Sequence, residues 1–234
     1  MEKREKIYEG KAKILYTTDD PDLVIQYFKD DATAFNAAKK GTVDEKGIIN
    51  NKISEKVFEL LESKGIPTHL EKRLNDREML VKKVEIIQAE VVVRNKATGS
   101  LCRNLGFEEG LLLDPALLEF CYKRDDLNDP LFTEQHMLAL NIATSKEIAV
   151  IEDMTRKINE LMRAFFAGLN LELVDFKLEF GRYKGKVILA DEISPDTCRL
   201  WEIGTGKKLD KDRFRHDLGN IKEAYEEVLS RVSG

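Results

Sequence analysis

Val187-Ile-Leu-Ala-Asp-Glu-Ile-Ser-Pro-Asp-Thr-Cys-Arg-Leu-Trp201 is the stretch that decides how this chain folds. Its first four residues are apolar and predict a buried strand, and acidic residues follow them at once. Pro195 cannot donate a hydrogen bond to a sheet, so we expect the chain to leave the sheet just past Glu192. Carboxylates at the end of a buried strand are unfavourable unless a cation or hydrogen-bond donors receive them. The stretch therefore predicts a charged site at a strand end, with a plain solvated turn as the alternative.

The segment before this stretch predicts a partner strand. Leu173–Gly181 alternates strictly between two faces, and its charged face carries Asp175, Lys177 and Glu179. Gly185 suits the left-handed third position of a three-residue turn. In the register that such a turn sets, Lys177 lies opposite Asp191 and Glu179 lies diagonal to it.

Two carboxylates that converge in this way suit a magnesium ion, which prefers hard oxygen ligands and also accepts phosphate oxygens. We therefore expect Glu179 and Asp191 to hold Mg²⁺. Two plainer interpretations stay open: a polar sheet face in contact with solvent, and a simple cross-strand ion pair between Lys177 and Asp191.

Size and composition narrow the class of protein. The 234 residues can form one large domain or two small ones. A formal net charge of −5 argues against nucleic acid as a main partner, although it leaves room for a local basic pocket. The three cysteines form no Cys-x-x-Cys pair, which fits reduced thiols in the cytoplasm. No signal peptide and no membrane span are expected, because the amino terminus is charged and no run approaches 18 apolar residues.

Two segments near the amino terminus predict contacts with phosphate groups. Residues 7–16 read as two short strands around a tight turn at Gly10, with Lys11 and Lys13 pointing the same way. Such a turn can lie over phosphates, or it can be an ordinary hairpin with surface lysines. Lys82 lies in a mostly apolar strand, where it either holds nucleotide phosphates or protects a sheet edge from aggregation.

The segment from Glu90 to Gly106 combines a strand with the start of a helix. Arg94 lies in a valine-rich strand, and Ser100 is the predicted N-cap of a short helix that Gly106 ends. Free N–H groups at a helix start, with an arginine nearby, form an anion site. Capping alone explains Ser100, but it does not explain an arginine inside an apolar strand.

The remaining pattern predicts helices and loops around these strands. We expect polar loops at Lys29–Asn36 and Lys39–Gly47, and helices at Asn50–Lys64, Asp114–Lys123, about Lys146–Ala167 and from about Asp212 onward. Arg215 lies near the start of the last helix, where a cation opposes the helix dipole. This misfit points to an anion contact, although exposed arginines often have no such role.

Four motifs of this chain occur in the same order and with similar spacing in a known family. They are Tyr8-Glu-Gly-Lys-Ala-Lys13, Glu90-x3-Arg94-Asn95-x3-Gly99-Ser100, Val174-Asp-Phe-Lys-Leu-Glu-Phe-Gly181 and Asp191-Glu-x-Ser-Pro-Asp-x-x-Arg199. Through them the chain resembles the phosphoribosylaminoimidazole-succinocarboxamide synthase (SAICAR synthetase) family from residue 7 to about residue 229. Enzymes of this family use ATP to join carboxyaminoimidazole ribonucleotide (CAIR) to L-aspartate in de novo purine synthesis. Asn36 departs from the family, because some members carry aspartate there.

The resemblance and the residue patterns together predict an α+β fold with two lobes. Residues 1–85 would form a small antiparallel nucleotide lobe with one helix. Residues 86–234 would form a larger sheet-and-helix lobe with the metal and ribonucleotide sites, and ATP would lie in the cleft between the lobes. We also expect a homodimer.

The resemblance also implies roles for individual residues. An acid and an amine do not condense unaided in water, so ATP must first activate the carboxylate, most simply as an acyl phosphate. ATP would be bound by Gly10, Lys11, Ala12, Lys13 and Lys82, with adenine between Leu15, Val24, Val81 and Ile86. The ribonucleotide phosphate would be bound by Arg94, Ser100, Arg199 and Arg215. Lys177 would bind the reacting carboxylate, and Asp175 and Asp196 the ribose or the aminoimidazole.

Two other functions stay open on the sequence alone. A small-molecule kinase would use the same magnesium and lysines but would pass phosphate to a hydroxyl group. A non-catalytic nucleotide-binding regulator would tolerate the loss of one acidic residue.

Overall fold

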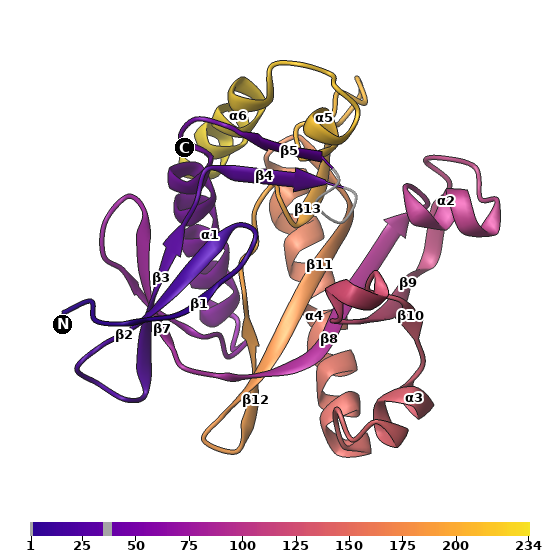
Figure 1. Ribbon diagram of the computed structural model, residues 1–234. Helices are drawn as coiled ribbons and strands as arrows, with labels where there is room; N and C mark the ends of the chain where they lie inside the picture. Colours follow the sequence, from indigo (N-terminus) through magenta and orange to yellow (C-terminus); the bar gives the residue numbers. More distant parts are fainter. Residues whose placement is uncertain (1, 35–38) are drawn as a thin grey trace.

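The computed structural model describes residues 2–34 and 39–234, and its strands there form two large antiparallel sheets and one small one (Figure 1). The first large sheet has the order β1-β2-β3-β7-β6. Its strands span, in that order, Lys6–Glu9, Lys13–Thr17, Leu23–Phe28, Glu78–Lys82 and Leu70–Arg73. The small sheet pairs β4 (Asp31–Ala34) with β5 (Lys39–Thr42), where we had expected only loops. Asn36 lies outside the described residues.

The second large sheet is built around the long strand β11. Its order is β10-β9-β8-β11-β12, and β13 also pairs with β11. The strands span Leu131–Phe132 (β10), Leu112–Tyr122 (β9), Glu85–Lys96 (β8), Leu171–Tyr183 (β11), Lys186–Ala190 (β12) and Cys198–Glu202 (β13). Because β12 and β13 pair with opposite halves of β11, residues 191–197 leave the sheet beside the middle of that strand. The predicted strand end before Pro195 is confirmed.

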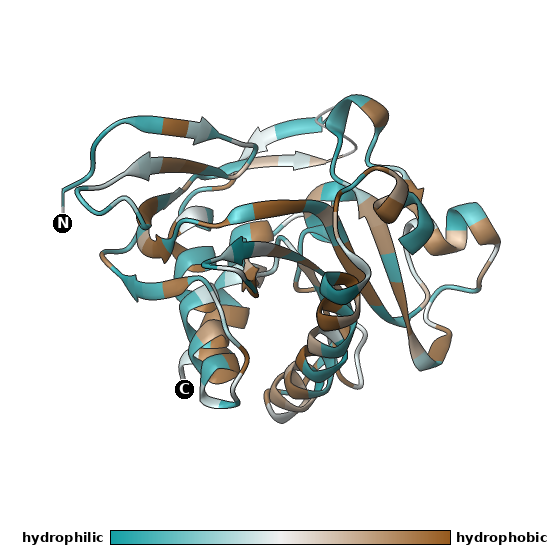
Figure 2. Ribbon diagram, turned by 90° about the horizontal axis from the view of Figure 1, so that it is seen from below, coloured by the Kyte–Doolittle hydropathy of each residue, from teal (hydrophilic) through white to brown (hydrophobic). Residues whose placement is uncertain are grey.

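Three long helices gather on one side of the strands, as Figure 2 shows. They are α1 (Lys46–Ser63), α4 (Ser145–Gly168) and α6 (Ile221–Ser233). The apolar stripes of α1 and α4 are buried in a core that both large sheets share, as their helical periodicity predicts. None of the helices among the described residues is long and apolar enough to cross a membrane.

The predicted helix at Asp114–Lys123 is wrong, because this segment is strand β9. A local Asp-Pro start signal suggested the helix, but Leu118 and Phe120 alternate into the core and the segment pairs with β8. The pairing register is irregular between Arg94 and Lys96, and Pro115 lies in the extra length of β9 there. Proline is therefore tolerated, because no backbone N–H is needed at this position to pair with β8.

Several helix boundaries also differ from the sequence prediction. The N-cap of α2 (Ser100–Leu105) is Gly99, not Ser100, whose hydroxyl instead accepts a hydrogen bond from Arg94. The helix expected from Asp212 onward is divided into α5 (Asp212–Arg215) and α6. The short helices α3 (Glu134–Ala139) and η1 (Asp125–Leu127) complete the described part of the fold.

Candidate active site

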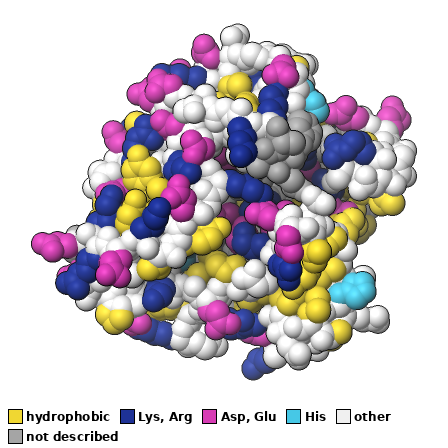
Figure 3. Space-filling model, in the orientation of Figure 1, with side chains coloured by type: hydrophobic (Ala, Val, Ile, Leu, Met, Phe, Trp, Pro, Cys, Tyr) yellow, Lys and Arg dark blue, Asp and Glu magenta, His cyan; other side chains and the backbone are white. Residues whose placement is uncertain are grey.

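A large pocket opens between the two large sheets, and Figure 3 shows it as a hollow lined by charged side chains. Its volume of about 1420 Å³ exceeds the roughly 300–1,000 Å³ that is usual for the pocket of one small ligand. All of the residues that we predicted to bind nucleotide, metal or substrate line this one pocket. The fold thus brings together side chains from both ends of the chain.

The turn between β11 and β12 differs from the predicted one. It has two residues, Lys184 and Gly185, both with positive φ, which is the geometry of a tight type I′ hairpin. Glu179 therefore pairs with Ala190, and a simple extension of β12 would send Asp191 to the opposite face of the sheet. The predicted register was wrong.

Asp191 nevertheless reaches the face of Glu179 because it leaves the ladder. Its φ of 67° places it in the left-handed region, which redirects the side chain at the strand end. Its Oδ2 lies 3.3 Å from the Nζ of Lys177, and that same nitrogen lies 2.6 Å from Oε1 of Glu179. The predicted convergence of the two carboxylates is present, although the turn that we had expected to produce it is absent.

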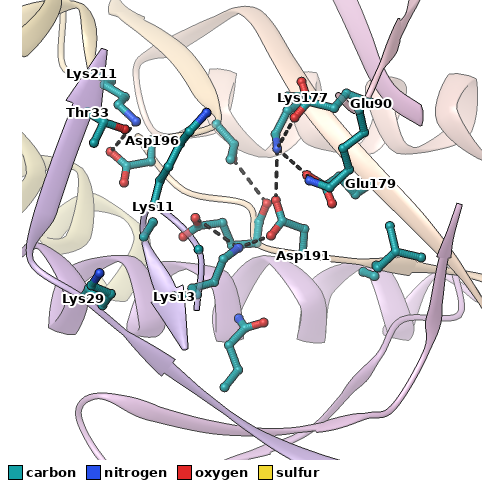
Figure 4. Close-up of a pocket in the computed structure, with 18 of the residues that line it drawn as sticks. Lys11, Lys13, Lys29, Thr33, Glu90, Lys177, Glu179, Asp191, Asp196 and Lys211 are labelled. Atoms are coloured by element: carbon teal, nitrogen blue, oxygen red, sulfur yellow. Dashed lines mark hydrogen bonds and ion pairs between the residues drawn. The ribbon is translucent and has the colours of Figure 1, made fainter. Parts of the chain in front are cut away.

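Lysines and carboxylates alternate around this point, as Figure 4 shows. Lys177 also donates to Glu90 at 3.1 Å, and Lys13 is bonded to Asp191. Lys13 lies 3.3 Å from Oε1 of Glu192, which is buried. Glu192 therefore belongs to the charged cluster, a role for which the sequence pattern offered no signal.

Lys123 is a further lysine of this cluster, and our sequence interpretation missed it. Its Nζ donates to Oε1 of Glu179 at 2.8 Å from the end of β9. Because β9 was predicted as a helix, the prediction did not place Lys123 opposite a strand. The alternation of apolar residues at Leu118 and Phe120 is the signal that could have revealed it.

Burial and charge fix the protonation states of this cluster. Burial alone would lower the pKa of Lys177, but Glu179, Asp191 and Glu90 raise that pKa well above its ordinary value. Burial alone would raise the pKa of Asp191, but Lys13, Lys177 and Lys123 hold that pKa far below its ordinary value. The lysines are therefore charged and Asp191 is ionised at neutral pH.

The donor set can serve a magnesium ion that a ligand helps to hold. No group of three or more acidic, histidine or cysteine side chains in residues 2–34 and 39–234 is arranged to hold a metal by itself. Glu179 and Asp191 instead offer two hard oxygens that converge on one nitrogen. Mg²⁺ is commonly bound by one or two carboxylates together with phosphate oxygens and water, so the two acids fit this metal.

A second charged group lies in the same pocket around Asp175. Arg94 and Arg199 both donate to Oδ2 of Asp175, at 3.1 and 2.7 Å, and Arg94 also donates to the hydroxyl of Ser100 at 2.9 Å. A Cβ on Gly99 would come within 2.8 Å of the Arg199 guanidinium, so glycine permits this close approach. The predicted group of Arg94, Ser100 and Arg199 is thus assembled from three separate segments.

Arg215 joins this group through a carboxylate. Asp212 accepts from Nε of Arg199 at 2.9 Å and from Nη1 of Arg215 at 2.6 Å. Burial alone would raise the pKa of Asp212, but the two arginines lower it to about 2. The helix that carries Arg215 has only four residues, so the neighbouring acid, rather than a helix dipole, explains its position.

Asp196 is deeply buried and is held by several groups of the protein. Its carboxylate accepts hydrogen bonds from Lys46, from Asn50 at 3.0 Å and from the hydroxyl of Tyr225 at 2.8 Å. Lys211 lies 4.0 Å away on the pocket side. Asp196 therefore connects α1, α6 and the pocket, and its contact with a substrate stays a prediction.

The other end of the pocket is apolar, with Leu15, Val24, Val81 and Ile86 in its lining. Lys82 lines this end too, but its Nζ donates to the carbonyl oxygens of Thr68 and Leu70, at 3.0 and 3.1 Å. Beside it, burial lowers the pKa of His69 to about 3, so the imidazole is neutral. The Nε2 of His69 has no hydrogen-bond partner among the described residues.

The turn between β1 and β2 lies at the mouth of the pocket. Gly10 packs against the ring of Tyr8, where a Cβ would come within 3.0 Å of ring atoms. Lys11 reaches across to Oδ1 of Asp125 at 2.6 Å, and Ala12 lines the pocket next to it. The turn thus bridges the two large sheets at the point where Lys13 enters the acidic cluster.

Comparisons with known proteins agree along the whole chain. Residues 6–232 match the family model described as SAICAR synthetase. The chain is 58% identical over 233 residues to a phosphoribosylaminoimidazole-succinocarboxamide synthase of Clostridium kluyveri, with 100% of this chain and 99% of that protein covered. A crystal structure of the synthase from Ehrlichia chaffeensis is 48% identical, with a TM-score of 0.96 and 98% of each chain covered. A SAICAR synthetase solved in complex with ADP is 45% identical, with a TM-score of 0.94 and 97% of each chain covered. The chain therefore belongs to the SAICAR synthetase family, the ATP-dependent ligases of purine biosynthesis.

Proposed function

We propose that this chain joins the carboxylate of CAIR to the amine of L-aspartate at the expense of ATP, giving SAICAR, ADP and phosphate. The observation that carries the proposal is the placement of two different charged groups in one pocket. Glu179 and Asp191 converge on Lys177 at one point, and Arg94 and Arg199 converge on Asp175 at another. A ligase of this kind must hold a metal–nucleotide complex and a ribonucleotide at the same time, and this pocket is larger than is usual for one small ligand.

The reaction consists of two displacements, the first at the γ-phosphorus of ATP and the second at the carboxyl carbon of CAIR. An oxygen of the CAIR carboxylate attacks the γ-phosphorus of ATP, the bond to the β-phosphate oxygen breaks, and ADP departs. The aspartate nitrogen then attacks the acyl carbon, its extra proton is lost, and the carbon–oxygen bond to phosphate breaks. Water must be kept from the acyl phosphate between the two steps, which favours a deep pocket.

The nucleotide occupies the side of the pocket built from the first sheet. We assign adenine to the apolar surface of Leu15, Val24, Val81 and Ile86, and the phosphates to Gly10, Lys11, Ala12 and Lys13. Lys82 lies at the same end of the pocket. Because its ammonium group donates to two backbone carbonyl oxygens, we assign it a supporting role there and not a direct contact with the phosphates. The relative solved with ADP supports a nucleotide in this fold.

Glu179 and Asp191 would hold Mg²⁺ together with phosphate oxygens of the nucleotide. The metal would supply charge neutralisation on the transferred phosphoryl group. Lys177 pairs with both acids and with Glu90. With the acids on the metal, Lys177 would keep Glu90 as its counter-charge and would turn its ammonium group toward the reacting carboxylate. These three side chains therefore orient the two reacting groups toward each other.

The ribonucleotide phosphate would be bound by Arg94, Arg199, Ser100 and Arg215. Two guanidinium groups that now share the carboxylate of Asp175 match the fork geometry that phosphate oxygens accept. Asp175 would then be available for hydroxyl or amino groups of the ribonucleotide. Asp196 would approach the same ligand through the side of its carboxylate that faces Lys211.

We extend the proposal to the organisation of the protein. We place the boundary between a nucleotide lobe and a substrate lobe near residue 85, where the first sheet ends and β8 begins. Free thiols at Cys102, Cys121 and Cys198 support a cytoplasmic location. Exposed leucines on α2, β9 and β10 (Leu105, Leu112 and Leu131) support a homodimer.

A coupled assay for ADP tests the proposed function. We expect the purified protein with Mg²⁺ and ATP to release ADP rapidly only when CAIR and L-aspartate are both present, and to form SAICAR in equal amount. Omission of either substrate is the control. ADP release with sugars or alcohols in place of CAIR would instead identify a kinase, and tight ATP binding without turnover would identify a regulator.

A further inference from the structure

Lys123 is a lysine of the pocket to which the mechanism above gives no role. It follows the last residue of β9, and its Nζ lies 2.8 Å from Oε1 of Glu179. About a third of its side chain is exposed, whereas that of Glu179 is buried, so the ammonium group stands on the open side of the acid. Its position is therefore compatible with contact to a bound ligand.

The three lysines of the acidic cluster differ in how many carboxylates they contact. Lys13 contacts Asp191 and Glu192, and Lys177 contacts Glu90, Glu179 and Asp191. Among residues 2–34 and 39–234, Glu179 is the only carboxylate within ion-pairing distance of Lys123.

This difference would matter if Glu179 and Asp191 held a metal. Lys13 would keep Glu192 and Lys177 would keep Glu90, so both would retain a counter-charge. Lys123 would lose its one carboxylate when a phosphorylated ligand is bound. An ammonium group in a partly desolvated pocket then needs an anion close by.

The segment that follows Lys123 indicates which anion is in reach. Asp125 lies two residues further on and accepts from Lys11 of the β1–β2 turn at 2.6 Å. Lys123 is therefore held beside the turn to which we assign the nucleotide phosphates, and beside the acid to which we assign the metal. The terminal phosphate of a nucleotide bound in this way would lie between these two points.

We infer that Lys123 is a catalytic residue that contacts the phosphoryl group passed from ATP to the carboxylate when its ion pair with Glu179 is released. The inference rests on the proposed function, because it takes the metal and the phosphates to be where that function needs them. Lys123 neutralises charge on the oxygens of the transferred group while the bond to ADP breaks and the bond to the carboxylate forms.

The test compares triphosphate with diphosphate binding, in addition to turnover. Lys123→Met removes the charge, Lys123→Arg keeps it, and Lys157→Met removes a lysine whose ion pair with Asp153 is exposed and outside the pocket. Calorimetry measures the affinity for ADP and for a non-hydrolysable ATP analogue, each with Mg²⁺, and thermal unfolding checks that each variant is folded. Lys123→Gln takes the place of Lys123→Met if the latter does not fold.

We expect Lys123→Met to weaken binding of the triphosphate analogue by about tenfold while ADP binding changes by less than about threefold. Its kcat should fall by roughly a hundredfold, and Lys123→Arg should recover much of the analogue binding. Equal losses for the two nucleotides, or a kcat within about threefold of the wild type, would overturn the inference. If the wild-type protein releases no ADP with CAIR and aspartate, the proposed function fails, and the ratio of the two affinities still reports on Lys123 alone.

Discussion

At the scale of single residues, the backbone of Asp191 decides where its carboxylate points. The left-handed conformation, with φ of 67°, brings an acid that follows β12 to the same point as Glu179 in β11. Aspartate and asparagine enter this region more readily than most residues. A change at this position can therefore remove the charge without disturbing the strand end.

Asp191→Asn should lower turnover by more than about a hundredfold and leave the fold intact. The variant loses a carboxylate that we assign to Mg²⁺, a loss comparable to removing one electrostatic contact to a transition state. Lys13 keeps Glu192 and Lys177 keeps Glu179 and Glu90, so neither lysine is left without a partner. Steady-state kinetics and near-ultraviolet circular dichroism measure the two effects. Retained turnover would remove Asp191 from the metal site.

At the scale of elements, the β11–β12 hairpin shows what the sequence could and could not predict. The strict alternation of Leu173–Gly181 predicted β11, and Pro195 predicted the end of the next strand, because both signals are local. The turn length was mispredicted, because Lys184 adopts a left-handed conformation that lysine rarely favours. The pairing register depends on that residue, so the hydrophobic pattern alone could not predict which side chains of β12 lie on the same face as Glu179.

Strand β9 shows the opposite kind of error. Its Asp-Pro pair is a strong local helix signal, and pairing along β8 overrides it. Part of the pocket lining was predictable from motifs, since Glu90–Ser100 supplies Arg94 and Asp191–Arg199 supplies Asp191, Asp196 and Arg199. Lys123, Glu192 and His69 were missed because their positions depend on tertiary pairing.

The turn itself offers a test at this scale. Gly185→Ala should lower the free energy of unfolding by about 1–2 kcal/mol, because alanine is strained at φ of 77°. Lys184→Asn should raise it by a few tenths of a kcal/mol or more, because Asn-Gly is the preferred pair for this turn. Urea unfolding measures both changes. Activity should not change, since neither residue lines the pocket, and a Gly185→Ala variant as stable as the wild type would refute the turn assignment.

At the scale of the whole molecule, Asp196 ties distant parts of the chain together. Lys46 begins α1, Tyr225 lies in α6, and both bond to this one carboxylate. Burial alone would raise the pKa of Asp196, but Lys211 and Lys46 hold that pKa below its ordinary value. The folded state therefore takes up this proton less readily than the unfolded state. The stability from this carboxylate is full above the ordinary aspartate pKa of about 4 and is lost as the pH falls below it.

Asp196→Asn should lower the free energy of unfolding at pH 7 by about 3–5 kcal/mol, because Lys46 is buried and would lose its counter-charge. Between about pH 5 and pH 2 the variant should lose less further stability than the wild type. Urea unfolding across this range measures both effects. Asp44→Asn, which breaks an exposed pair with Lys222, is the matched control and should cost less than about 1 kcal/mol. An acid limb identical to that of the wild type would contradict the assignment.

The alternation of lysines and carboxylates in the pocket has a consequence for ligand entry. Because the ammonium groups of Lys13, Lys123 and Lys177 are already neutralised by acids of the protein, binding at this cluster is an exchange of ionic partners and not an attraction to an open positive surface. A ligand with only negative charge would displace a carboxylate from its lysine and leave that buried carboxylate without a counter-charge. A ligand with charges of both signs avoids this cost. Its dication would pair with the carboxylates and its phosphates would pair with the lysines, so each charged side chain would gain a new counter-charge. The lysine–carboxylate cluster is thus matched to a ligand with charges of both signs, as the proposed metal–nucleotide complex would be.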